Sequence, residues 1–150
     1  MRYMGIDVGQ RRVGLAISDP LGLIARGLVT IDCQGHNLEE VWHKIREQVD
    51  RWEVGQVVVG LPKNMNGTIG PQAKIVQDFA QGLKEVLPPE VGLVMWDERL
   101  STVTAERGLI QADFSREKRK HIIDQVAAAV ILEGYLSYQK NATGEVKENE

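Results

Sequence analysis

The chain has 150 residues, 43% of them apolar and 26% charged, which suffices for one hydrophobic core and leaves little room for a second. The net charge of −3 argues mildly against a nucleic-acid-binding protein, although a cluster of catalytic carboxylates would itself lower this sum. The single cysteine, Cys33, excludes an internal disulfide and a cysteine-rich zinc site, and no apolar run reaches the length of a membrane span, so we expect a cytoplasmic protein without a membrane partner.

The first part of the chain predicts three antiparallel strands. Residues 3–8 and 13–18 are short apolar runs joined by a turn, and residues 23–31 form a third run after a second turn at 19–22. No helical spacing interrupts them. This alternation of apolar runs and turns is typical of consecutive strands that pair with one another.

The pattern then alternates between helices and strands. Asn37 is placed to cap a helix whose apolar residues are Leu38, Val41, Ile45 and Val49. Residues 56–60 are a valine-rich run, as expected of a buried central strand. Pro71 suits the first turn of a second helix, whose predicted apolar side comprises Ile75, Val76, Phe79, Leu83 and Val86.

The last part of the chain predicts a strand over 91–96, a short helix over 101–110 and a longer helix from 115 to about 138. The apolar side predicted for the long helix comprises Ile123, Ala127, Val130, Ile131 and Gly134. Residues 141–150 are polar and predict a disordered tail. We therefore expect one domain over 1–140 and a tail over 141–150.

This order of elements predicts an α/β fold with a five-stranded mixed sheet, in which three antiparallel strands are followed by parallel crossovers and helices cover both faces. Ribonuclease H-like nucleases and actin- or hexokinase-type ATPases both begin in this way. The chain is too short for the duplicated ATPase architecture. A ribonuclease H-like fold is therefore favoured.

Asp7 is the first candidate catalytic residue. Strand alternation places it on the face of Tyr3 and Gly5, opposite Ile6. A carboxylate among strand residues is costly to bury unless a partner compensates its charge, and a divalent cation would do so. The flanking Gly5 and Gly9 would leave space for a phosphate. An aspartate at a strand end without a catalytic role remains an alternative.

Two further acidic positions lie where the predicted topology would bring their side chains close to Asp7. Asp97 and Glu98 directly follow the last predicted strand, where open α/β sheets place their chemistry. Only one of them should join Asp7; the longer Glu98 is favoured, and Asp97 is the alternative. Asp124 lies on the last helix, and the small Ala128 one turn later would let that helix approach the sheet. Each acid alone could be an ordinary loop or surface residue.

Together these carboxylates predict a metal site. Hard oxygen ligands suit Mg²⁺ or Mn²⁺, and two such ions about 3.5–4 Å apart could activate water and stabilise a leaving oxygen. The residues expected to hold the ions are Asp7, Glu98 and Asp124.

Three cations are candidates for contacts with a phosphate backbone. Lys63 lies in the glycine-rich segment 60–71 between a strand and a helix start, a plausible phosphate seat, although an ordinary connection remains open. Arg99 follows the acidic pair. Lys120, one turn before Asp124, could bind a phosphate or pair with that acid.

Four segments closely resemble the YqgF/RuvX family of bacterial proteins, in the family's order: GIDVGQRRVGLAISD, VVGLPKNMNGTIGPQA, DERLST and IDQVAAAVILEGYL. The resemblance covers residues 3–138. It implies a ribonuclease H-like, divalent-metal nuclease related to RuvC-type junction resolvases, with acidic positions at Asp7, the Asp97–Glu98 pair and Asp124. It also implies 5′-end maturation of pre-16S ribosomal RNA, or resolution of Holliday junctions.

We therefore expect phosphodiester hydrolysis on nucleic acid, first in pre-16S ribosomal RNA processing and alternatively on four-way DNA. Structured RNA and branched DNA both fit the resemblance. A homodimer is possible, because a resolvase needs two active sites on a symmetric substrate. Two other classes stay open: a nucleotide-binding module resembling half of an actin-like ATPase, and a non-catalytic RNA-associated protein.

Overall fold

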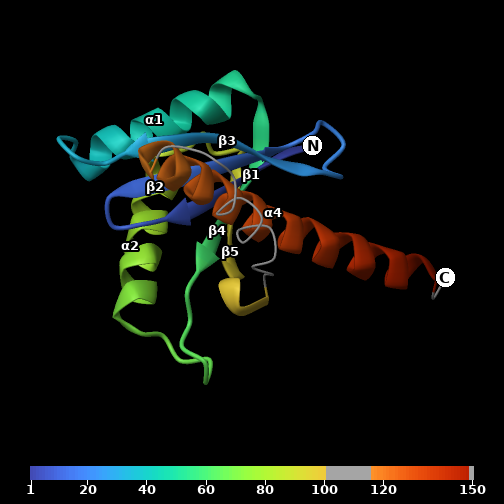
Figure 1. Ribbon diagram of the computed structural model, residues 1–150. Coiled ribbons are helices and arrows are strands. Elements are labelled where there is room, and N and C mark those ends of the chain that lie inside the picture. Colours follow the sequence, from blue (N-terminus) through green and yellow to red (C-terminus); the bar gives the residue numbers. More distant parts are fainter. Residues whose placement is uncertain (101–115, 149–150) are drawn as a thin grey trace.

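The computed structural model describes residues 1–100 and 116–148. Its N-terminal part is an antiparallel meander of three strands: β1 (Arg2–Val8), β2 (Arg12–Ser18) and β3 (Ala25–Asp32). Two later strands, β4 (Val54–Leu61) and β5 (Gly92–Asp97), join parallel to β1. The sheet order is β3-β2-β1-β4-β5, so β1 lies at its centre (Figure 1). The predicted mixed sheet is confirmed.

Two helices cover one face of the sheet, α1 (Leu38–Arg51) and α2 (Pro71–Val86). Asn37 caps α1 as predicted, because its side-chain oxygen accepts a hydrogen bond of 2.9 Å from the backbone N–H of Glu40. The main core lies between these helices and the sheet, where the inward side chains of the strands include Met4, Ile6 and Leu15.

The apolar side predicted for α2 is partly wrong. Ile75 is 57% exposed, whereas the buried residues of this helix are Ala73, Val76, Phe79, Ala80 and Leu83. The small alanines let α2 approach the sheet closely. The buried face is therefore centred on Val76 and Leu83 and leaves Ile75 toward solvent.

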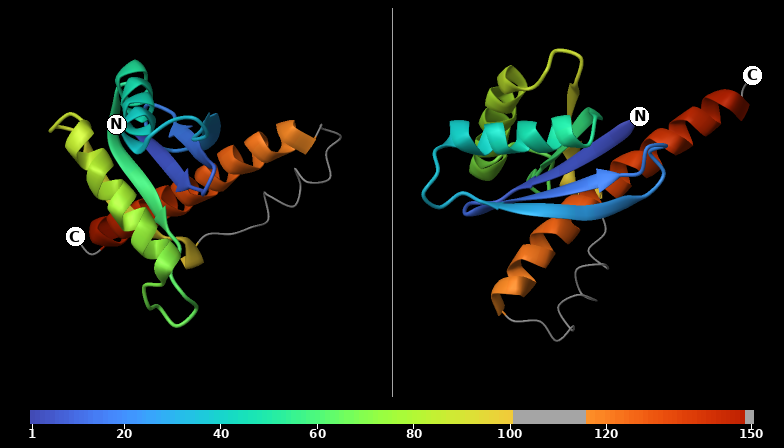
Figure 2. Two further views of the ribbon diagram at one scale, coloured as in Figure 1. Left: turned by 90° about the vertical axis from the view of Figure 1, so that its left-hand side faces the viewer. Right: turned by 90° about the horizontal axis from the view of Figure 1, so that it is seen from above.

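A single long helix, α4 (Arg116–Glu148), crosses the other face of the sheet, and Figure 2 shows it running diagonally past the strands. Its buried residues are Ala128, Ile131, Leu132 and Leu136. They pack on Ala16, Val58 and Trp96 from the sheet. Helices thus cover both faces, as predicted.

The sequence placed the buried stripe of α4 slightly wrongly. Ile123, Ala127 and Val130 are only half-buried, and the stripe passes one residue further along the chain, through Ala128. The reason is close packing: Ala128 is the residue at which the helix backbone meets β1.

The structure describes the long helix predicted near the C-terminus but not the short helix predicted before it. The helix predicted over 101–110 lies outside the described residues, and β5 is followed by a short 3-10 turn, η1 (Glu98–Leu100). α4 continues to Glu148, beyond its predicted end at about 138. The division into a domain over 1–140 and a tail over 141–150 stays a prediction. None of the described helices is long and apolar enough to span a bilayer.

Candidate active site

Asp7 lies near the end of the central strand β1 and is half-buried on the face that α4 covers. Two residues earlier, Gly5 meets that helix: a Cβ atom added to Gly5 would lie 2.6 Å from the carbonyl oxygen of Ala128. Because alternate residues of a strand share a face, Asp7 points to the same side. The sequence assigned this face correctly.

A glycine lies beside Asp7 on each neighbouring strand. Gly14 of β2 is its direct antiparallel partner. On the other side, Ile6 pairs with Val59, so the next residue of β4, Gly60, follows alongside Asp7. The two strand residues beside the central carboxylate are therefore both glycines.

Asp124 lies over the first of these glycines. A Cβ atom added to Gly14 would collide with the backbone carbonyl of Asp124 in α4, so helix and strand are in direct contact at this point. The small residue on β2 thereby brings Asp124, distant in sequence, next to Asp7. The structure places both acids at the same part of the sheet.

Glu98 lies over the second glycine. A Cβ atom added to Gly60 would lie 2.6 Å from Oε1 of Glu98 and 2.5 Å from the Cδ1 atom of Ile131. Asp97 pairs in register with Leu61, whose side chain belongs to the main core on the opposite face. Of the acidic pair, Glu98 is thus the residue on the face of Asp7.

The orientation of Asp124 is set by a residue that sequence reasoning did not assign. Nε of Arg12 donates a hydrogen bond of 2.6 Å to Oδ2 of Asp124, and the two side chains are 26% and 19% exposed. Lys120, one turn before Asp124 on α4, is exposed and is not the ion-pair partner of this acid.

The chemistry of this donor set fits a hard divalent cation, but the side chains do not form a closed set of ligands. The candidate carboxylates come from β1, η1 and α4, and each is half-buried. Among the side chains that the structure describes, no three Asp, Glu, His or Cys residues are close enough together to hold a metal ion. The ion pair with Arg12 occupies one oxygen of Asp124.

The space expected beside the flanking glycines is not available to a phosphate at Gly5. Gly5 is covered by the backbone of α4, and a Cβ atom added to Gly9 would lie 2.7 Å from the carbonyl oxygen of Arg12 in the adjacent turn. These glycines allow the backbone to pack closely. The expectation of space for a phosphate is therefore wrong at Gly5 and stays a prediction at Gly9, which is exposed.

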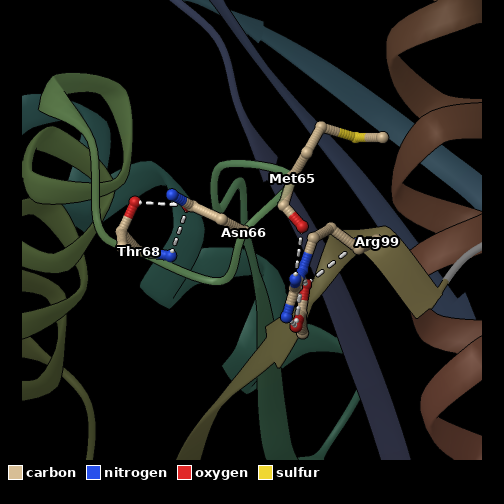
Figure 3. A network of polar contacts seen from close by, with 5 residues as sticks. Met65, Asn66, Thr68 and Arg99 are labelled. Carbon is tan, nitrogen blue, oxygen red and sulfur yellow. Dashed lines mark hydrogen bonds and ion pairs between the residues drawn. The ribbon is translucent and has the colours of Figure 1, made fainter.

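The glycine-rich segment after β4 is a hydrogen-bonded loop. The side-chain oxygen of Asn66 accepts hydrogen bonds from the backbone N–H and the hydroxyl of Thr68, at 3.1 and 2.7 Å. Gly67 takes a positive φ of 85°, which favours glycine. Nη1 of Arg99 donates to the carbonyl oxygen of Met65 at 3.2 Å, as Figure 3 shows, so η1 and the loop are joined.

Arg99 is held mainly by Asp97. Its Nη2 lies 2.6 Å from Oδ2 of that carboxylate, and its Nε and backbone N–H also donate to Asp97. These hydrogen bonds lower the pKa of Asp97, and the charge of the half-buried Lys63 contributes in the same direction. Two predicted phosphate-binding cations thus lie beside the acid that faces away from Asp7.

The Arg12–Asp124 pair predicts a measurable coupling. A double-mutant cycle with Arg12→Gln and Asp124→Asn should give an interaction free energy of about 1 kcal/mol in urea unfolding, because the pair is mostly shielded from solvent. Additive effects of the two substitutions would mean that the ion pair does not form. The exposed pair Lys74–Asp78 in α2 is the control, with an expected coupling of about 0.3 kcal/mol.

The contact between Asp97 and Arg99 predicts a pH effect. Because the pKa of Asp97 is lowered in the folded chain, its stabilising contribution is complete above the ordinary pKa of 3.8 and is lost as the pH falls below it. In Arg99→Gln, carboxyl NMR titration should show a raised Asp97 pKa. Asp19 is an internal control, since backbone N–H groups such as that of Ile24 lower its pKa; an equal change at both acids would contradict the assignment.

Comparison with known proteins finds close relatives in sequence and more distant ones in structure. The proteins of Bacillus thuringiensis (strain Al Hakam) and Bacillus anthracis (strain A0248) are each 53% identical over 136 residues, which is 91% of this chain and 98% of theirs; both are named "Putative pre-16S rRNA nuclease". Among solved structures, Thermus thermophilus RuvC in complex with a Holliday junction substrate superposes with a TM-score of 0.55 at 14% identity, covering 93% of this chain and 96% of RuvC. The fowlpox virus Holliday junction resolvase gives a TM-score of 0.51 at 15% identity, covering 94% and 99%.

The two structural matches support the ribonuclease H-like fold predicted from the sequence, in which the same mixed sheet is covered by helices. A family model described as "RuvX: Holliday junction resolvase" matches residues 1–138, nearly the range that the four sequence motifs span. This chain belongs to the RuvX (YqgF) family of nucleases.

Proposed function

We propose that this chain is a divalent-metal-dependent endonuclease that hydrolyses phosphodiester bonds in precursor 16S ribosomal RNA. The observation that carries the proposal is the placement of three carboxylates around one point of the sheet. Asp7 is on the central strand, and Asp124 and Glu98 lie over Gly14 and Gly60 on either side. A structural role alone would not require acids from three separate elements at this point.

Asp7, Glu98 and Asp124 are the residues that would hold Mg²⁺ or Mn²⁺, as one ion or two. The chemistry that such ions supply is neutralisation of charge at the scissile phosphate and activation of water. The central strand fixes the backbone of Asp7. Arg12 holds Asp124 close by, and we infer that this carboxylate exchanges Arg12 for the cation when the site is loaded.

The cations around the site have separate roles in this proposal. Lys63 and Lys120 remain candidates for direct contact with the nucleic acid backbone. Arg99 already donates to Asp97 and to the carbonyl of Met65, so it would reach a phosphate only by giving up one of these partners. Its first role is therefore to hold the loop beside Glu98. Such contacts would weaken as the salt concentration rises.

The choice of RNA rests on the relatives, since the proteins that are 53% identical are named for pre-16S ribosomal RNA. A substrate of this kind is present in the cytoplasm, in agreement with the predicted location. Resolution of Holliday junctions is the second candidate, favoured by the description of the family and by the shared fold with RuvC. That reaction would call for a homodimer with two sites.

The test is cleavage of both substrates side by side. A labelled RNA carrying the 5′ leader of 16S ribosomal RNA and a four-way DNA junction are incubated with the protein in Mg²⁺, in Mn²⁺ and in chelator. We expect leader cleavage with either metal and none in chelator. Faster cleavage of the junction would assign the second function, and absence of cleavage of both substrates in both metals would overturn the proposal. Mature 16S RNA and linear duplex DNA are the matched controls.

A further inference from the structure

Three arginines surround the indole ring of Trp52. The guanidinium carbons of Arg2, Arg26 and Arg51 lie 5.6, 5.5 and 5.7 Å from the ring centroid. The residues come from the start of β1, the start of β3 and the last turn of α1, with Trp52 at the C-cap of that helix. Segments far apart in the sequence thus build one cationic group, which we call the Trp52 cluster.

The charge of the Trp52 cluster is not balanced by carboxylates. Within the part of the chain that the structure describes, none of its three arginines belongs to an ion pair, and the neighbouring Glu53 forms none with them. The C-terminus of α1 contributes about half a negative charge, too little to offset three cations. Because each guanidinium carbon lies within 5.7 Å of the same ring centroid, no two of them are more than about 11 Å apart. The Debye length at physiological salt is about 8 Å, so their repulsion is not fully screened.

Stacking on tryptophan explains where the arginines lie, but not why there are three. A cation over an indole face is attractive, and one arginine would suffice to cover the ring. Arg26 and Arg51 are exposed to solvent, and Arg2 is half-buried. An accessible concentration of positive charge in a chain of net charge −3 is suited to an anionic partner.

The geometry favours phosphate over a nucleic acid base. The indole is fixed by a hydrogen bond of 3.2 Å from its Nε1 to Oε1 of Gln48, and the arginines already occupy its surroundings. A base therefore has no open ring on which to stack. The planar guanidinium groups keep donors for phosphate oxygens, which they can bind through two parallel hydrogen bonds.

The Trp52 cluster is remote from the acidic site. Arg2 and Asp7 lie near opposite ends of β1, about 17 Å apart at the usual rise of a strand. Strand alternation puts them on opposite faces of the sheet. A nucleic acid that reaches the cluster would do so with a segment other than the one being cleaved.

We propose that the Trp52 cluster binds the phosphate backbone of the nucleic acid substrate at a second site, away from the scissile bond and without regard to base sequence. This inference rests on the proposed function, because it takes the substrate to be a nucleic acid. It adds a contact that large, structured substrates can make and short oligonucleotides cannot.

The test is the salt dependence of binding by Arg26→Gln/Arg51→Gln, compared with Lys74→Gln/Lys84→Gln, which removes the same charge from exposed positions of α2. Binding of labelled 16S leader RNA is measured by anisotropy in Ca²⁺ between 50 and 200 mM salt, concentrations at which about two lost phosphate contacts are resolved. The first variant should bind about tenfold more weakly, and its log Kd–log[salt] slope should fall by about 1.4–1.8. The α2 variant should retain most of the affinity and slope.

Further variants keep the result interpretable. Arg26→Lys/Arg51→Lys retains the charge and should recover the slope, whereas a purely structural role would not be recovered. If the glutamine double variant unfolds, the single variant Arg51→Gln should still lower the slope by about 0.7–0.9. Equal slopes for all variants would overturn the inference. Loss of binding to poly-glutamate, with RNA binding unchanged, would instead assign the cluster to an acidic protein and also overturn it.

These outcomes are distinct from failure of the proposed function. A wild-type protein that cleaves leader RNA, with variants that bind it as tightly and with the same slope, would leave the nuclease proposal standing and remove only the second site. A wild-type protein that neither cleaves nor binds RNA or junction DNA would remove both.

Discussion

Replacing Asp7 by asparagine is expected to slow cleavage of leader RNA by about three orders of magnitude, roughly 4 kcal/mol of transition-state stabilisation. The two side chains have nearly the same shape, but asparagine has no negative charge with which to hold a divalent cation. Asp7 is also the acid at the centre of the site, between Gly14 and Gly60. Single-turnover cleavage at saturating protein measures the effect on the chemical step.

The same substitution should leave folding intact. Asparagine keeps the size of the aspartate side chain and one of its oxygens, so the midpoint of thermal unfolding should stay within a few degrees of the wild-type value. Asp78→Asn, on the exposed face of α2, is the matched control and should cleave at the wild-type rate. If Asp7→Asn cleaved as fast as this control, Asp7 would have no catalytic role, and the metal site would have to be sought elsewhere.

The second large effect is expected from Gly14→Ala. An added Cβ would collide with the backbone carbonyl of Asp124, and a helix backbone cannot turn aside as a flexible side chain can. Either α4 moves away from β2 or the strand bends. We expect destabilisation of about 3 kcal/mol in urea unfolding, together with loss of cleavage as Asp124 is displaced from Asp7.

Gly92→Ala is the control for this prediction. A Cβ at Gly92 would have its nearest neighbour at 3.7 Å, an ordinary van der Waals distance, and its φ is not positive. Its effect on the free energy of unfolding should stay within about 0.5 kcal/mol. A Gly14→Ala variant as stable and as active as Gly92→Ala would show that the backbone of α4 does not lie against Gly14 of β2.

Most of the fold could be predicted from local patterns. The cap at Asn37, the helix start at Pro71 and the alternation in the first strands each report on short stretches of chain, and all agree with the structure. The errors concern packing. Ile75 and the stripe of α4 were misplaced because hydrophobicity does not tell which side of a helix small residues allow to approach the sheet.

The candidate site could likewise be predicted where local patterns mark it and not where distant segments meet. The acidic residues stood out as carboxylates at strand ends or in an apolar helix, and the family motifs single them out as well. Arg12 did not, because its partner Asp124 is 112 positions away and nothing local links them. Gly14 and Gly60 were a usable signal that sequence reasoning missed. Each glycine interrupts an apolar strand, which indicates that another part of the chain packs where a side chain would otherwise lie.

The placement of Asp124 over β2 has a consequence for synthesis of the protein. The other acids and both glycines belong to the first 100 residues, whereas α4 follows them in the chain and carries Asp124 to them. Domains generally fold as units as they emerge during translation, and contacts of such long range cannot form before their later partner has appeared. During synthesis, the chain would thus carry only an incomplete candidate nuclease centre until α4 has left the ribosome. Nuclease activity would begin only after the ribosome, itself rich in RNA, has released this helix.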